Sequence, residues 1–218
     1  MKSLLIKDFK IMMQQKMSLL LFIGISIFMV INGVDLTFCI GYATMLVTIL
    51  MLGTIAYDEH ENGMSFLMTL PISRKQYVLS KYIFTLLGIL ITDCILLITI
   101  GIYKICVPSE LLMSEYVMTA VMLFFTAIIM SSFMIPVNFK YGVDKSRLVL
   151  LLFAGIISVI GLVFSRFADY VPHGIRTLVA IAAKVTPAMA GIMLGIAALT
   201  IFILSLLCSV KIIEHKDY

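Results

Sequence analysis

The sequence predicts an all-α membrane protein with six transmembrane helices in one bundle. Three observations support this prediction. The 218-residue chain is 62% hydrophobic and 13% charged, whereas a soluble domain is about 45–50% apolar. Its apolar residues form runs near the roughly 20 residues that a membrane-crossing helix needs. The polar residues collect in short segments between these runs.

The apolar runs place the transmembrane helices in chain order. The first two, residues 17–34 and 36–57, are joined by so short a turn that they must form an antiparallel hairpin. The other four are expected at residues 82–103, 115–137, 148–165 and 187–210. Because the chain contains no internal repeat and no long linker, residues 1–218 are predicted to be a single transmembrane domain.

Two amphipathic segments are expected to lie beside the spans. Residues 1–16 carry apolar side chains at helical spacing with lysines largely between them, which is typical of an interfacial helix. We expect an elbow helix there. Residues 166–186 contain a Pro-His-Gly break and are too polar and short to span comfortably. They predict a re-entrant or amphipathic helix at the outer face, before the last span.

The distribution of basic residues predicts the orientation in the membrane. Twelve of the sixteen Lys and Arg residues lie at the two termini and in residues 58–81 and 138–147. The positive-inside rule places these segments in the cytoplasm. No cleavable signal peptide is expected, because the lysines are spread along residues 1–16 and do not precede an apolar core.

Residues 58–81 are the longest polar interruption between spans. This loop begins acidic, ends basic, and carries Phe66, Leu67 and Leu70 at helical spacing between its charged ends. An apolar patch in a charged loop is costly to leave in water. It is covered either by a partner protein or by lipid headgroups, and its flexible methionines favour the partner.

The sequence gives no indication of covalent chemistry. It lacks a GxxxxGK[ST] phosphate loop, so any ATP hydrolysis must take place on another polypeptide. His60 and Glu61 match the start of a zinc-protease HExxH pattern, but Met64 stands where the second histidine belongs. The four cysteines lack metal-ligand spacing, and no nucleophile elbow is present. We therefore predict no catalytic, cofactor or metal site in this chain.

Two features inside the spans stand out. Asp93 is the one acidic residue near the middle of a span, where a charge is costly. It is either a proton or substrate contact or, as we favour, a hydrogen-bond partner of a Ser, Thr or backbone group on a neighbouring helix. Gly191 and Gly195 form a GxxxG pattern, which predicts close helix approach.

The loop also carries a family resemblance. Tyr57-Asp58-Glu59, Asn62-Gly63 and Leu70-Pro71-Ile72-Ser73-Arg74 are similar to the acidic-to-"LPxSR" loop of small bacterial permeases. With the predicted order of helices, the chain resembles the membrane subunit of type-2 ABC transporters. The small permeases in question include the membrane subunits of phenol-soluble modulin exporters.

The resemblance implies a function and a set of partners. In that family the loop supplies a coupling helix that inserts into a separate ATPase, which carries the ATP and magnesium, and two permeases assemble with two ATPases. It implies export of amphipathic or antimicrobial peptides, or of hydrophobic small molecules, across a bacterial cell membrane by a pair of identical or related permeases. The ATPase-docking residues are then expected to be Glu61, Met64, Phe66, Leu67, Leu70, Arg74 and Lys75.

Two other function classes stay open at this point. An ion-gradient-coupled transporter or channel needs polar residues along several spans, whereas Asp93 stands nearly alone. A purely structural or sensory membrane subunit is the other alternative. A neighbouring reading frame that encodes an ATPase distinguishes the exporter from both.

Overall fold

A computed structural model describes residues 2–32, 34–59, 63–69, 72–106, 113–142 and 186–215, together with isolated residues between 145 and 162. The described part of the chain is helical, without strands. Its helices are α1 Lys2–Gln14, α2 Lys16–Ile31, α3 Leu36–Glu59, α4 Gly63–Thr69, α5 Arg74–Cys106, α6 Met113–Tyr141 and α9 Pro187–Glu214. The all-α prediction is confirmed for these residues.

Four helices, α3, α5, α6 and α9, are long and apolar enough to cross a membrane. They confirm the helices predicted at residues 36–57, 82–103, 115–137 and 187–210. The helix predicted at residues 17–34 is α2, whose 16 residues give a length of only about 24 Å. It reaches membrane-crossing length only together with α1, from which it is bent by 65°. The helix predicted at residues 148–165 is described only at scattered positions, all of them helical, and the segment predicted at 166–186 lies outside the described residues except for Thr186.

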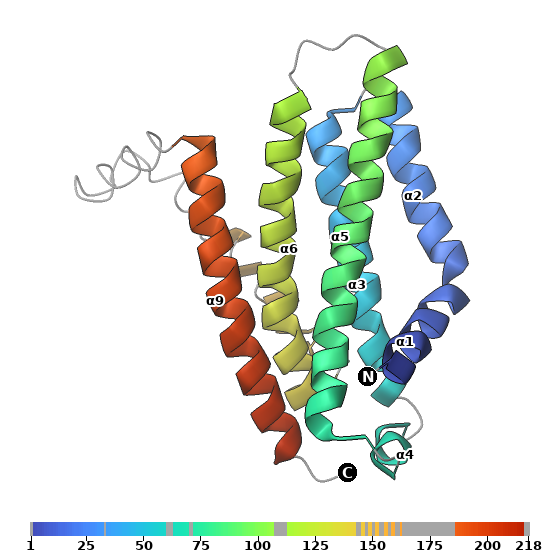
Figure 1. Cartoon of the computed structure of the whole chain (residues 1–218), viewed down its shortest axis with the longest axis vertical. Coiled ribbons are helices and arrows are strands. Elements are labelled where there is room, and N and C mark those ends of the chain that lie inside the picture. The colour runs from blue at the N-terminus through green and yellow to red at the C-terminus, as the bar shows by residue number, and fades with distance from the viewer. Residues whose placement is uncertain are drawn as a thin grey trace, which may run out of the picture.

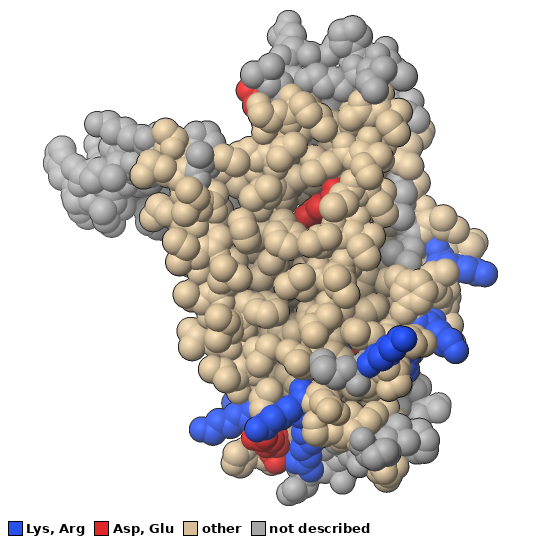
Figure 2. Space-filling model, in the orientation of Figure 1, with Lys and Arg blue, Asp and Glu red and all other residues tan. Residues whose placement is uncertain are grey.

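The long helices stand side by side in one bundle (Figure 1). α3, α5 and α6 pack against one another, α9 packs mainly on α6, and α2 packs on α3. α1 leans against α3 and α5 at the end of the bundle where α4 also lies. Lys and Arg side chains gather toward this end (Figure 2), which we call the charged end.

The predicted loop at residues 58–81 is shorter than expected, because both flanking helices extend into it. α3 continues to Glu59, and α5 begins at Arg74. The start of α5 is a capping box: the Gln76 backbone N–H donates to Ser73 Oγ at 3.2 Å, and the Ser73 N–H donates to Gln76 Oε1 at 3.4 Å. The sequence prediction ended α3 before Asp58 and began α5 after Lys81, because both residues are charged. Both lie inside helices, since charged side chains of other helices neutralise them.

The GxxxG glycines of α9 face α6 of the same chain. A Cβ built on Gly195 would lie 3.1 Å from Phe125 Cζ, and one on Gly191 would lie 3.9 Å from Met118 Sδ. The predicted close approach therefore occurs between α9 and α6 within one chain. Hydroxyl groups join α9 to α5 near the charged end, where Tyr82 of α5 hydrogen-bonds Ser205 and Ser209 of α9 at 2.5 and 2.8 Å.

Candidate docking site at the charged end of the bundle

The short helix α4 lies between the ends of α3 and α5 and is held against the bundle by its apolar side chains. Met64 is only 4% exposed and belongs to a buried cluster with Ile55, Tyr77 and Val78, against which Leu67 also packs. The turn into α4 is tight, because a Cβ on Gly63 would lie 2.8 Å from the Asp58 carbonyl oxygen. Only glycine fits there without a shift of the backbone.

The structure places Met64 and, in part, Leu67 on the side of α4 that packs on the bundle. Both were predicted as direct contacts of a partner protein. Met64 instead faces the interior, since a methionine beside the apolar ends of α3 and α5 buries its side chain there, and Leu67 is partly buried on the same side. Both side chains fasten α4 to the bundle. Glu61, Leu70 and the side chain of Phe66 lie outside the described residues.

The two basic docking candidates lie at the end of α9. The Arg74 guanidinium donates to the carbonyl oxygens of Ile213 and Glu214, at 3.0 and 2.7 Å. A cation at these last carbonyls is favourable because the helix dipole is negative there. Lys75 Nζ lies 3.6 Å from Glu214 Oε1 and its side chain is 72% exposed. Arg74 thus fastens α5 to α9, while Lys75 remains at the surface.

Behind α4 lies a group of four charged side chains, Lys7, Asp8, Asp58 and Lys81, which we call the charge cluster. Lys81 Nζ lies 2.7 Å from both Asp8 Oδ1 and Asp58 Oδ2. Lys7 Nζ lies 2.5 Å from Asp58 Oδ1 and 3.5 Å from Asp8 Oδ1. Tyr77 donates its hydroxyl to Asp58 Oδ2 at 3.0 Å. Two positive and two negative charges therefore neutralise one another.

The charge cluster is largely shielded from solvent. Asp8 is 0% and Lys81 1% exposed, and Lys81 also donates to the backbone and hydroxyl oxygens of Thr54 at 3.3 Å. Ion pairs in such surroundings are costly to break, because the remaining charge stays buried without a partner. The charge cluster joins α1 to the end of α3 and the beginning of α5. It therefore fixes the two helix ends between which α4 is suspended.

Sequence reasoning missed the charge cluster because it treated Asp58 and Lys81 as the two ends of an exposed loop. One signal was present. Tyr77, Lys81 and Thr85 recur at every fourth position and therefore share one face of a helix. The acidic partner from α1 could not be found this way, since Asp8 is 73 residues from Lys81. No group of His, Cys, Asp and Glu suited to a metal ion occurs within the described ranges.

Asp93 lies in the middle of α5 and joins it to α3. Its Oδ1 is 2.7 Å from Thr44 Oγ1, which also lies 2.8 Å from the Ile40 carbonyl oxygen. The Thr44 hydroxyl is the donor in both contacts, so its single proton is shared between Asp93 Oδ1 and the Ile40 carbonyl oxygen. Asp93 thus makes the kind of hydrogen bond to a neighbouring helix that the favoured prediction names, and its role in transport stays a prediction. Among the described residues, Oδ2 has no hydrogen-bond partner.

This geometry predicts different outcomes for two substitutions of Asp93. Asp93→Asn retains a side-chain oxygen that can accept the hydrogen bond from Thr44, so we expect normal yield of folded protein. Asp93→Leu removes the bond between α3 and α5 and leaves Thr44 facing an apolar side chain, so we expect a lower yield. The measurement is the monodisperse fraction after detergent extraction at equal expression. Equal yields for Leu and wild type would show that this hydrogen bond does not stabilise the bundle.

The geometry agrees with the comparison with known proteins. Residues 3–214 match the family described as ABC-2 family transporter protein. No curated protein and no solved structure matches the chain. The match includes every long helix, α4 and the charge cluster. The chain therefore belongs to the ABC-2 family of transporter proteins and is a membrane permease subunit.

Proposed function

We propose that this permease is the membrane subunit of an ATP-driven exporter and that a separate ATPase binds it at α4. The observation that carries the proposal is the position of α4, which is suspended between the ends of α3 and α5 and packed on the bundle through Met64. The ATPase binds ATP and magnesium and contacts α4. Phe66 and Leu70 are the proposed apolar anchors of this contact, and Glu61 and Lys75 are its proposed charged residues.

The charge cluster can transmit movement of α4 to the helices in the membrane. Movement of α4 shifts the end of α3 and the start of α5, because Met64 packs beside Ile55 and Tyr77. Lys81 and Asp58 pass the shift to Asp8 of α1 through ion pairs of 2.7 Å. Packed cores rearrange between discrete states and deform little, so the helices move together. Two permease copies, or this permease and a related one, would rock between inward and outward access.

The substrate class follows from the resemblance of the loop. We propose amphipathic or antimicrobial peptides, or hydrophobic small molecules, exported across a bacterial cell membrane. The permease itself performs no covalent chemistry in this scheme.

The test of docking is a double variant, Phe66→Ala with Leu70→Ala. Each truncation should weaken association with the ATPase by roughly 1–3 kcal/mol, as expected for an apolar anchor at an interface centre. Lys75→Ala is the control, because an exposed ion pair contributes only about 0–1 kcal/mol. The measurement is pull-down of a candidate ATPase from a neighbouring reading frame, with permease-stimulated ATP hydrolysis. Normal binding and stimulation by the double variant would leave α4 as a helix that rests on lipid.

Orientation provides an independent prediction. With both termini and α4 in the cytoplasm, single cysteines placed at Glu61 and His215 in a cysteine-free chain should be protected from an impermeant reagent added outside intact cells. Cysteines placed at Asp35 and Ser109 should react. Permeabilised cells serve as the control, in which all four positions should be labelled. Labelling at Glu61 in intact cells would exclude a cytoplasmic ATPase as the partner of α4.

A further inference from the structure

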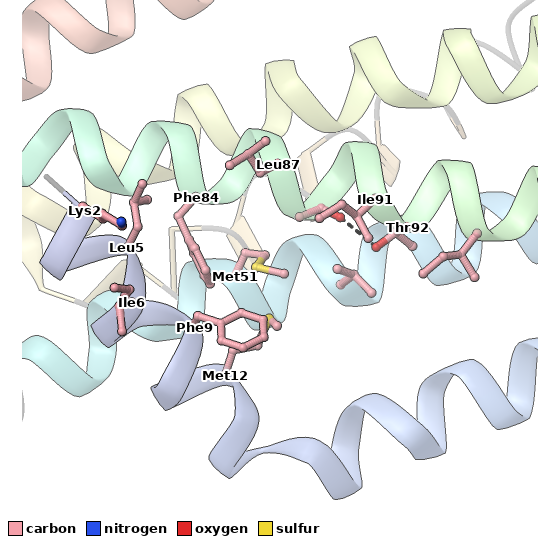
Figure 3. Close-up of a pocket in the computed structure, with 13 residues that line it drawn as sticks. Lys2, Leu5, Ile6, Phe9, Met12, Met51, Phe84, Leu87, Ile91 and Thr92 are labelled. Atoms are coloured by element: carbon pink, nitrogen blue, oxygen red, sulfur yellow. Dashed lines mark hydrogen bonds between the residues drawn. The ribbon is translucent and has the colours of Figure 1, made fainter.

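A groove runs along the bundle between α1 on one side and α3 and α5 on the other (Figure 3). Its volume is about 490 Å³. Leu5 and Phe9 of α1, Met51 of α3, and Phe84 and Ile91 of α5 line it, as the close-up shows. Lys2 lies at one end of the groove and Thr92 toward the other.

The lining restricts what can occupy the groove. Among the described residues that line it, Lys2 and Thr92 alone have polar side chains, and the Thr92 hydroxyl already donates to the Gly88 carbonyl oxygen at 2.8 Å. An extended peptide would bring backbone N–H and C=O groups that the walls cannot satisfy, at a cost of several kcal/mol each in an apolar medium. The occupant must therefore be apolar along its length and polar or charged at the Lys2 end.

The dimensions fit one lipid chain. The lining residues of α5 extend from Phe84 to Ile95, which corresponds to about 16 Å at 1.5 Å per residue. This is close to half of the roughly 30 Å hydrocarbon core, the depth of one leaflet.

The charge beside the groove favours an anionic headgroup. Lys2, Lys10 and Lys16 are exposed, and none has an ion-pair partner within the described part of the chain. Lys7, by contrast, is engaged by Asp58. Basic side chains beside a bilayer attract anionic lipids. Of these, Lys2 of α1 lines the groove and places an unpaired positive charge at its end.

We infer that this groove binds one acyl chain of an anionic phospholipid from the leaflet in which α1 lies, with the lipid phosphate paired to Lys2. The lipid fills the space between α1 and the membrane-crossing helices. It thereby holds α1 in the position in which Asp8 reaches Lys81. This inference concerns the permease alone and does not depend on an ATPase or on the transported substrate.

The test is photolabelling of the full chain in nanodiscs. The discs contain phosphatidylcholine with a minor fraction of phosphatidylglycerol that carries a diazirine in its acyl chain, and a parallel sample carries the diazirine on phosphatidylcholine. After irradiation, mass spectrometry of peptides locates the label. We expect the phosphatidylglycerol probe to concentrate on α1 and on the segment of α5 from Phe84 to Ile95. Even labelling of all lipid-facing helices, α9 included, would overturn the proposal.

Two pairs of variants test binding of the acyl chain and binding of the lipid headgroup separately. Ile91→Trp fills the groove and should abolish the concentrated label, whereas Ile98→Trp, on an exposed position of α5 outside the groove, should leave it. Lys2→Gln should lower the preference for phosphatidylglycerol by about fivefold, whereas Lys10→Gln should change it less. Lys2 is exposed, so its replacement does not threaten folding.

Two results would assign the groove to a different occupant. Cross-links between two permease copies through α1 and α5 would mean that a second copy covers it. Displacement of the lipid label by an added amphipathic helical peptide, with the peptide cross-linked in its place, would mean that protein is the preferred ligand. Either result overturns the lipid assignment.

Discussion

Lys81→Met is expected to destabilise the permease by about 3–5 kcal/mol, because it leaves Asp8 and Asp58 buried with only Lys7 to neutralise them. The methionine side chain fills a similar volume, so the effect reports charge and not a cavity. Lys81 contacts both carboxylates at 2.7 Å. Because Asp8 is fully buried, water cannot replace the lost ammonium group as a partner of its carboxylate. The measurement is the temperature at which half of the monodisperse protein in detergent is lost.

Lys75→Met is the matched control for this prediction. Lys75 lies six residues earlier on the same helix but is 72% exposed and 3.6 Å from its partner. Its replacement should change stability by only about 0–1 kcal/mol. A second comparison adds Asp8→Asn to Lys81→Met, which leaves Lys7 and Asp58 as one neutral pair and should recover part of the loss. Equal stability of Lys81→Met and wild type would mean that the charge cluster does not hold α1 to the bundle.

Met64→Ala is expected to release α4 from the bundle while the long helices stay folded. Truncation of a buried methionine costs about 2–5 kcal/mol in protein cores, and α4 has only seven residues with which to compensate. Opening of this segment should therefore become at least about 30-fold more frequent, at 1.4 kcal/mol per factor of ten. Hydrogen exchange measured by mass spectrometry should show faster exchange of residues 63–69 and unchanged exchange in α3 and α5.

The control is Met45→Ala on α3, since Met45 is 45% exposed and its truncation leaves no interior cavity. Exchange in α4 should not change in this variant. If Met64→Ala also leaves it unchanged, α4 is held by contacts other than the Met64 side chain. The proposed transmission from α4 into the bundle would then need a different first step.

Much of the fold could be predicted because membrane helices obey a local rule. A run of about 20 apolar residues crosses the bilayer whatever its neighbours are, so the central parts of α3, α5, α6 and α9 were predicted at the right places in the chain. The ends were less accurate. Arg74 and Lys81 were assigned to a loop, yet both belong to α5, because the partners that neutralise Lys81 come from other helices.

The sequence predicted where the candidate docking site lies in the chain, but not which of its side chains face the bundle and which face outward. Phe66, Leu67, Leu70 and Met64 share an apolar pattern, and helical spacing does not say which side faces the bundle. The structure places Met64 inward and Leu67 partly inward. Arg74, predicted as a surface contact, caps the last carbonyls of α9, which follow it by 139 and 140 residues.

By itself, the sequence determined the membrane class, the order of the long helices and the location of the polar segment that contains α4, since these depend on composition and local periodicity. Only the tertiary structure decided that Asp8, Asp58 and Lys81 form one buried charge cluster and that a groove separates α1 from α5. Both features depend on which side chains meet across distances of up to 73 residues in the chain. Charge neutralisation and cavity shape are properties of such contacts, and no local pattern encodes them.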